Sequence, residues 1–278
     1  MLWFIILFFA AIALLFTFSK LNAGKLKKRQ LAGLDKIEHL KSLISLIQQH
    51  RGLSSALING DKSVEYKLLN QERNIASLIG KLNDTNIDGL NCRWASFLDH
   101  WQRLKRVYIK SDALNNFQQH TLLISNLLYL LEDEAESSQL SASMISELPT
   151  LGFVWRELVM ATENVGQTRA IGTGVATVGS CSQVDKIRLS FLEQHITQTS
   201  EKVLSKLACT SNEKNAHEQL LKNAYSKMKA LSNVINNELL NAKKVKISQK
   251  DYFEIASDTI AALNAIFDHQ VKQVRQLI

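Results

Sequence analysis

Apolar residues recur at alternating three- and four-residue spacings through most of this 278-residue chain. This is the spacing that lines one face of an α-helix. Pro149 is the only proline, and the 11 glycines are sparse. Strand-rich folds need alternating patterns and frequent turn residues, and neither is present. With 46% hydrophobic residues, the chain can fill one sizeable core or two smaller ones. The sequence therefore predicts an all-α fold of long helices.

Turn residues and caps divide this pattern into helices. Asn59-Gly60-Asp61 is expected to end the first, which is compatible with a helix continuous with the N-terminal segment. Ser111-Asp112 is a cap, and Pro149 should bend or break a helix that begins near Ser141. The expected helical ranges are 28–59, 63–82, 94–108, 111–136, 141–149, 150–178, 182–209, 212–242 and 249–278. We expect one all-helical domain over 31–278, with two bundle halves of about 31–140 and 141–278.

The N-terminal segment has the composition of a membrane helix. Residues 1–18 are almost wholly apolar and uncharged, near the lower end of the ~17–25 residues that cross a bilayer as a helix. Five basic residues in the juxtamembrane segment 20–30 supply most of the net charge of +7, namely Lys20, Lys25, Lys27, Lys28 and Arg29. By the positive-inside rule, residues 1–19 predict a single-pass anchor in the lipid bilayer of the inner (cytoplasmic) membrane, with the domain in the cytoplasm. The alternative is a secretory signal peptide cleaved near Leu21-Asn22-Ala23.

Two of the predicted helices place an arginine within the apolar stripe, and a small residue takes the next stripe position. The first stripe contains Ile37, Leu40, Ile44, Ile47, Arg51, Ser54 and Ile58, and the second contains Trp155, Leu158, Thr162, Val165, Arg169, Gly172 and Ala176. Segments 51–57 and 169–175 also align without a gap, and each precedes a glycine turn, at Gly60 and Gly179. This is a faint internal repeat of two helix hairpins.

The paired arginines predict a site for a small anion between helices. A guanidinium keeps its proton, so its burial is unfavourable unless an anion or several acceptors contact it. Nitrate is planar and singly charged, and the paired N–H groups of a guanidinium match two of its oxygens. The other expected site residues are hydroxyl donors and small residues that leave room for a ligand, namely Ser54, Ser55, Thr168, Thr173, Gly52, Gly172 and Gly174. The alternative is that Arg51 and Arg169 lie at a bundle edge and pair with carboxylates such as Glu163 or Asp61.

Three segments carry a resemblance to a known family. Residues 46–60, LIQQHRGLSSALING, resemble the first signature of the nitrate- and nitrite-sensing (NIT) domain family, and residues 163–179, ENVGQTRAIGTGVATVG, resemble its later signature. Residues 116–140 are similar to the region between them, and the resemblance spans roughly residues 35–270. It implies two up-down helical bundles that bind nitrate or nitrite through interface arginines, here Arg51 and Arg169. His50 and Ala170 depart from the family pattern, in which an acidic residue and a glycine are common.

Other classes of chemistry find little support in the sequence. The histidines form no His-x-x-x-His or Glu-x-x-His pair, so we expect no metal site. We interpret His50 and His120 as helix-surface residues, with a place near the anion site as the alternative. The face from Trp94 to Trp101 is expected to be core. The three cysteines are odd in number and widely spaced, and we interpret them as reduced packing residues: Cys92, Cys181 and Cys209.

These observations favour a sensor over an enzyme. No phosphate loop, nucleophile elbow or cysteine–histidine signature is present, so we expect no catalysis and no cofactor. Little net charge remains beyond the basic segment, so we expect no nucleic-acid partner. Our hypothesis is a membrane-anchored sensor of nitrate or nitrite that signals to a separate protein partner, with a homodimer as one route. The alternative is a membrane-tethered helical adaptor without a small-molecule ligand.

Overall fold

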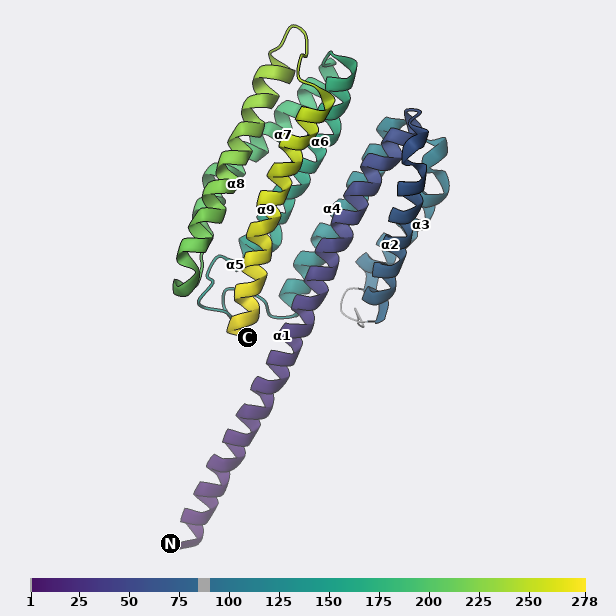
Figure 1. The fold of residues 1–278 in the computed structure, drawn as a ribbon. Helices are drawn as coiled ribbons and strands as arrows, with labels where there is room; N and C mark the ends of the chain where they lie inside the picture. Colours follow the sequence, from purple (N-terminus) through teal and green to yellow (C-terminus); the bar gives the residue numbers. More distant parts are fainter. Residues whose placement is uncertain (1, 85–90) are drawn as a thin grey trace.

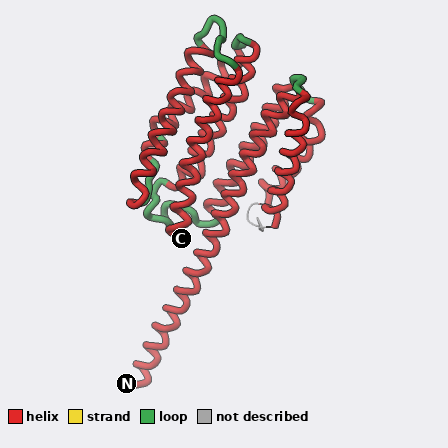
Figure 2. The backbone as a smooth tube through the Cα atoms, viewed as in Figure 1, coloured by secondary structure: helices red, strands yellow, loops and turns green. Residues whose placement is uncertain are grey.

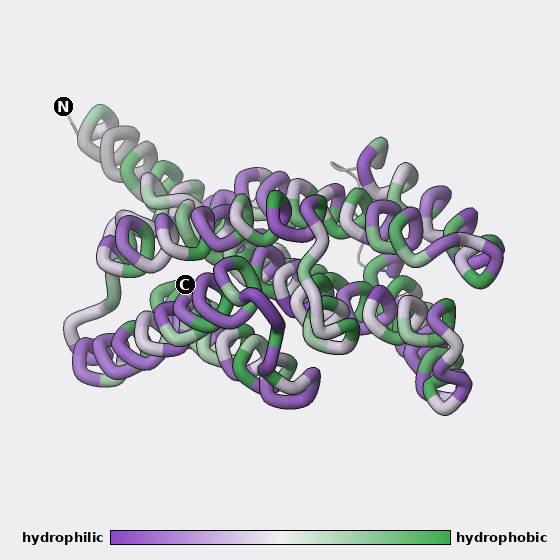
Figure 3. The backbone as a smooth tube through the Cα atoms, turned by 90° about the horizontal axis from the view of Figure 1, so that it is seen from above, coloured by the Kyte–Doolittle hydropathy of each residue, from purple (hydrophilic) through white to green (hydrophobic). Residues whose placement is uncertain are grey.

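The computed structural model describes residues 2–84 and 91–278, apart from the side chains of residues 2, 5–11, 13 and 91. Within these ranges the chain forms helices joined by turns, and they contain no strand (Figure 2). The predicted all-α fold is confirmed. Hydrophilic and hydrophobic residues interleave along the bundle helices, as expected for amphipathic helices that bury one face (Figure 3).

The helices form two groups that lie side by side, and successive long helices within each group run antiparallel (Figure 1). The first group contains α1 (Leu2–Ile58), α2 (Glu65–Asp84), α3 (Asn91–Val107) and α4 (Ala113–Ser137). The second group contains α6 (Val159–Val178), α7 (Gln183–Lys202), α8 (Lys214–Val234) and α9 (Gln249–Leu277). Within them, α1 packs against α2 and α4, whereas α9 packs against α6 and α8. We call these groups the first and the second bundle.

The apolar stripe predicted from the sequence forms the centre of the first bundle. Its residues on α1 are at most 1% exposed, namely Ile37, Leu40, Ile44 and Ile47. On α3, Trp94, Phe97 and Trp101 are buried as well, so the predicted core role of this face is confirmed. Burial of such side chains stabilises a fold by about 1.5–3 kcal/mol each. The packing of this stripe fixes which residues of α1 face the other helices.

Local signals set the helix ends. The Asp112 carboxylate accepts a hydrogen bond from the Asn115 backbone N–H at 2.8 Å, so the predicted cap of α4 is confirmed. Gly60 and Gly179 have φ values of 99° and 75°. Glycine adopts this left-handed conformation without steric strain, which explains why α1 and α6 end where the sequence predicts.

The connection between the bundles differs from the prediction. Residues 141–149 form successive turns rather than a helix. Leu140, Ile145 and Leu148 are buried there, and their five- and three-residue spacing does not follow one helix face. Gln139, with φ of 58°, ends the preceding helix. The Trp155 indole N–H donates to the Leu140 carbonyl at 2.9 Å and attaches the connection to the second bundle.

The predicted helix over 150–178 is divided in the structure. It begins as α5 (Leu151–Phe153), passes through a π-helical stretch at Val154–Leu158, and continues as α6. A second π-helical stretch, Ile235–Leu240, follows α8. Because a π turn adds a residue to the helical repeat, each stretch changes which side chains face the bundle.

The N-terminal half of α1 projects beyond both bundles (Figure 1). α1 is one helix of 57 residues, which agrees with a helix continuous with the N-terminal segment. Among the residues that the structure describes, no helix is both long enough and apolar enough to cross a bilayer. The predicted anchor over 1–19 falls in large part on side chains outside the described residues.

Candidate functional site

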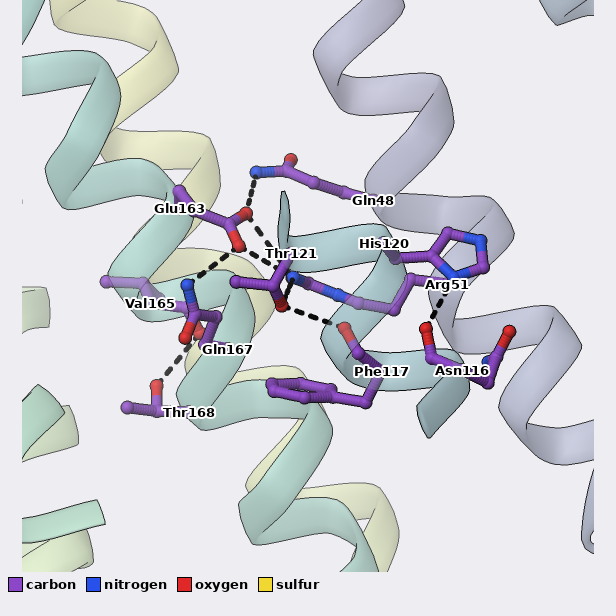
Figure 4. Close-up of polar contacts among 10 residues, drawn as sticks. All are labelled: Gln48, Arg51, Asn116, Phe117, His120, Thr121, Glu163, Val165, Gln167 and Thr168. Atoms are coloured by element: carbon purple, nitrogen blue, oxygen red, sulfur yellow. Dashed lines mark hydrogen bonds and ion pairs between the residues drawn. The ribbon is translucent and has the colours of Figure 1, made fainter. Parts of the chain in front are cut away.

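Arg51 projects from α1 toward α6 and joins the two bundles (Figure 4). Its Nη1 lies 2.6 Å from Oε1 of Glu163, and its Nη2 lies 3.3 Å from Oε2. The two side chains are 2% and 1% exposed. A bidentate guanidinium–carboxylate pair is among the stronger polar contacts in proteins. Glu163 therefore neutralises Arg51 in the interior, which was the alternative interpretation of this arginine.

Further polar groups complete the surroundings of this ion pair. The amide groups of Gln48 and Gln167 donate to the Glu163 carboxylate at 2.7 and 2.9 Å. Arg51 Nη1 also donates to the Thr121 hydroxyl at 3.2 Å, and its guanidinium lies over the Phe117 ring at 5.1 Å. These contacts come from α1, α4 and α6, so the site depends on the packing of both bundles.

Gly166 makes room for the guanidinium. A Cβ atom at this position would lie 3.3 Å from Arg51 Nη2 and 3.6 Å from Glu163 Oε2. The glycine therefore lets the ion pair lie directly against the backbone of α6. Gly166 precedes Arg169 by three residues, which places both on the same face of the helix.

Arg169 has a different environment from Arg51. Its Nη1 donates to the Ser257 hydroxyl of α9 at 3.0 Å, and its guanidinium lies over the Phe253 ring at 4.9 Å. No carboxylate lies within ion-pair distance of Arg169 among the described residues. Burial lowers the pKa of Arg169 below its ordinary value, the charge of Arg51 lowers it further, and Glu163 opposes both effects. The two guanidinium groups are therefore close enough to repel each other.

The predicted hydroxyl donors divide between the site and the cores. Ser54 and Ser55 contact the Asn116 side chain inside the first bundle, at 2.9 and 3.0 Å. Thr168 donates to the Val165 carbonyl at 2.8 Å. These three hydroxyls thus have partners within the protein. The Thr173 hydroxyl, one turn after Arg169, is buried and has no hydrogen-bond partner among the residues that the structure describes.

The predicted small residues do not all have the role that the sequence suggested. Added Cβ atoms at Gly52 and Gly174 would meet nothing within 4 Å, and both residues are exposed, so neither allows a close helix approach. Gly172 does, because a Cβ there would lie 2.2 Å from Cζ of Tyr252 on α9. Gly52 and Gly174 were predicted wrongly because they lie on exposed sides of their helices. The spacing of the stripe alone does not tell which small residue lies against a neighbouring helix.

Several site residues were missing from the sequence prediction: Gln48, Thr121, Gly166, Gln167 and Ser257. Helix spacing offered a signal for two of them, because Gln48 precedes Arg51 by three residues and Gln167 follows Glu163 by four. Thr121 and Ser257 lie on α4 and α9, so only the tertiary packing brings them to the arginines.

Some interpretations of single residues are wrong. His50 and His120 are both 0% exposed, so they are core residues rather than helix-surface residues. Their imidazole groups contact each other, and an adjacent polar partner explains why they can be buried. The cysteines are free thiols, but Cys92 is exposed and has no packing role.

Together, the fold and this site define a class: an all-helical two-bundle domain with a buried arginine–glutamate ion pair between its bundles. The chain belongs to the nitrate and nitrite sensing (NIT) family, whose model matches residues 42–275. It is also similar to a solved structure described as the NasR transcription antiterminator. The TM-score is 0.68 at 14% sequence identity, over 94% of this chain and 73% of that chain. At this identity the likeness shows the fold. No curated protein matches the sequence.

Proposed function

We propose that this protein is a sensor that binds nitrate or nitrite between its two bundles, with Arg51, Arg169 and Thr173 as ligand residues. The observation that carries the proposal is the charge at the bundle interface. The charges of the two guanidinium groups repel each other there, and the one carboxylate that acts on both is that of Glu163, which pairs with Arg51. One positive charge is left over, which matches a monovalent anion.

The chemistry of the surrounding groups supports a planar oxyanion. Arg169 has N–H groups beyond the one that donates to Ser257, and a guanidinium can meet two oxygens of nitrate at once. The buried Thr173 hydroxyl without a partner is a donor for a further oxygen. Leaving such a group unsatisfied costs about 1–3 kcal/mol, so a ligand that accepts from it gains affinity.

The consequence for signalling follows from where the ligand residues lie. Arg51 belongs to the first bundle, whereas Arg169 and Thr173 belong to the second. An anion that contacts both favours the arrangement in which the guanidinium groups are closest. Binding thus shifts the equilibrium between two packings of the bundles. In this proposal the shift is passed to a separate protein partner, and a homodimer is one way to do so.

The proposal includes attachment to a membrane by residues 1–19. Exposed apolar side chains on the projecting part of α1 support it: Trp3, Phe4, Ile12, Leu14, Leu15, Phe16, Phe18 and Leu21. The basic residues of segment 20–30 follow directly, which suits the phosphate surface of the cytoplasmic leaflet. Two C-terminal fusions test the attachment and its orientation. One carries a reporter that is active only in the cytoplasm, and the other carries a reporter that is active only after export.

Calorimetric titration of the full chain with nitrate, nitrite and chloride tests the ligand. We expect saturable binding of nitrate or nitrite, and a loss of roughly tenfold or more in affinity for Arg169→Ala, because a charge-assisted hydrogen bond contributes about 1.5–3 kcal/mol. Arg103→Ala is the matched control, since Arg103 is 68% exposed on α3 and pairs with Asp99. Equal affinity of wild type and Arg169→Ala would contradict the site.

The adaptor alternative predicts different results. An adaptor would show no heat with any of the three anions, and its partner would be recovered from membranes regardless of nitrate. The sensor predicts a partner set that changes with nitrate. The expected lack of nucleic-acid binding remains a prediction, and an RNA filter-binding assay with and without nitrate checks it.

A further inference from the structure

A buried polar cluster lies in the first bundle next to Arg51. His50 is 0% exposed on α1 and its Nδ1 lies 2.8 Å from Nε2 of His120 on α4. On its other side, His50 Nε2 lies 3.6 Å from Oε1 of Glu72 on α2. The Tyr108 hydroxyl donates to the same carboxylate oxygen at 3.1 Å. Trp101 of α3 contacts the His50 ring edge-on and closes the cluster.

The hydrogen bonds fix where the protons of both imidazoles reside. His120 Nδ1 lies 2.8 Å from the Asn116 carbonyl, which can only accept, so this nitrogen carries the proton (Figure 4). In neutral His120, Nε2 is then an acceptor, and it accepts a hydrogen bond from the N–H at His50 Nδ1. Neutral His50 consequently has a bare lone pair at Nε2.

That lone pair faces a carboxylate. His50 Nε2 is buried and has no hydrogen-bond partner, and Glu72 Oε1 is likewise an acceptor. Two acceptors facing each other in the interior are unfavourable. One added proton on Nε2 resolves the conflict, because it creates an imidazolium–carboxylate pair. The Glu72 side chain is 16% exposed and gives the proton a route from solvent.

We propose that His50, His120, Glu72 and Tyr108 form a proton-binding site that couples anion binding at Arg51 to pH. The coupling part rests on the proposed function. Its structural basis is that α1 and α4 meet in two consecutive residue pairs, His50 with His120 and Arg51 with Thr121. A change in the first pair therefore acts on the second.

The charges around the cluster set the direction of the effect. Burial lowers the pKa of His50 below its ordinary value, Glu72 opposes this, and Lys105 of α3 adds to it. Burial lowers the pKa of His120 to about 3, with further lowering by His50, Arg51 and His100. Burial would raise the pKa of Glu72, but the nearby His50 imidazole and the hydrogen bond from the Tyr108 hydroxyl lower it overall. The proton thus binds at the His50–Glu72 end, at a pH below about 6.5.

Proton binding adds one positive charge beside Arg51, so anion affinity should rise as the pH falls. Calorimetric titration of the full chain with nitrate at pH 7.5 and 5.5 measures this. We expect affinity on the order of fivefold higher at pH 5.5, near the low end of coupling between two sites. By the same linkage, nitrate should cause proton uptake at a pH below about 6.5, seen as a dependence of the binding heat on the buffer's ionisation enthalpy.

Glu72→Gln isolates the site without removing a buried histidine. The glutamine oxygen still accepts from Tyr108, while its amide donates to His50 Nε2 and replaces the proton. We expect this variant to bind nitrate at pH 7.5 like wild type but to lose the fivefold rise. Glu218→Gln is the matched control on α8, 62% exposed, and should keep the rise. An equal rise in Glu72→Gln would overturn the proposal.

A second measurement decides on the proton site independently of nitrate. NMR of the full chain with labelled histidine should show a His50 imidazole that titrates in the wild type, with a midpoint that moves downward in Glu72→Gln. If no anion binds at either pH, the proposed function fails while this titration still tests the proton site. A His50 signal that does not titrate, or one with the same midpoint in both proteins, would overturn it.

Discussion

At the residue scale, Arg51 illustrates what a buried cation requires. Its guanidinium has the Glu163 carboxylate, the Thr121 hydroxyl and the Phe117 ring as partners. A buried ion pair contributes little net stability, but removing one partner destabilises the fold strongly, because the remaining charge stays unpaired in the interior. The proposed function uses the same property, because an anion from solution would act on this charge.

Glu163→Gln tests whether the buried charge of Arg51 requires a negative partner. We expect it to destabilise the fold by on the order of 3 kcal/mol, a fall of roughly 6–12 °C in Tm. Nitrate should raise the Tm of this variant more than that of wild type, because the anion then supplies the missing negative charge. Thermal unfolding with and without nitrate measures both effects. Asp133→Asn, in a pair 38% exposed, is the control; equal nitrate shifts in wild type and Glu163→Gln would contradict the idea.

Lys41 gives a pH dependence at the same interface. Its Nζ donates to Asn264 Oδ1 at 2.6 Å. Burial lowers the pKa of Lys41 to about 8, although the negative charges of Asp268 and Glu163 raise it. Because the folded state holds this proton less tightly than the unfolded state, stability should rise between about pH 8 and pH 10.5. In Lys41→Met that contribution is absent, so the wild type should gain about 2 kcal/mol of stability relative to this variant between pH 7.5 and pH 10. Urea unfolding at the two pH values checks it, and a constant difference would argue against a buried lysine.

At the element scale, α6 and α9 approach each other closely at Gly172. Gly172 leaves the space that the Tyr252 ring fills, and the Tyr252 hydroxyl donates to the Thr168 carbonyl at 3.0 Å. Tyr252 lies on the same helix as Ser257, the partner of Arg169. The fit between these two helices therefore sets the position of Arg169.

Two glycine variants on α6 separate packing from helix propensity. Gly172→Ala should destabilise the fold by about 1–3 kcal/mol, because the new methyl group overlaps Tyr252. Gly174→Ala, on an exposed side with nothing within 4 Å, should instead stabilise it by about 0.5–1 kcal/mol. Chemical denaturation of both variants measures the difference. The same sign for both would show that Tyr252 does not constrain this position.

The sequence predicted those elements whose signals are local. Helix ranges, the cap at Asp112 and the turns at Gly60 and Gly179 follow from spacing and backbone preferences within a few residues. The region 141–149 was predicted wrongly, because its buried side chains take a spacing that is set by what lies beneath them. At the site, both arginines were found from their place in the stripes. The choice of Glu163 as partner of Arg51 depends on how the bundles pack, which periodicity does not encode.

At the scale of the whole molecule, several polar contacts connect the two bundles. Besides Arg51 with Glu163 and Lys41 with Asn264, Arg156 pairs with Glu132, and Arg275 contacts Asp35 and Glu38. Several of these side chains are partly exposed, and exposed ion pairs contribute little stability. Such an interface allows the bundles to move relative to each other.

Nitrate should therefore change the interface more than the bundle interiors. We expect slower amide hydrogen exchange in the halves of α1 and α6 that carry Arg51 and Arg169, with little change in α3 and α8. Hydrogen-exchange mass spectrometry of the full chain with nitrate or chloride measures this. Uniform slowing across all helices would indicate general stabilisation instead of a change at the interface.

The uninterrupted course of α1 has a mechanical consequence. At about 1.5 Å of rise per residue, roughly 46 Å of one helical rod separates Lys20 from Arg51. A hydrogen-bonded rod resists stretching, so an axial slide of the guanidinium end is also a slide of the lysine end. Under the proposed function, an anion that moves Arg51 along the helix axis would therefore move Lys20 by the same distance, like a piston.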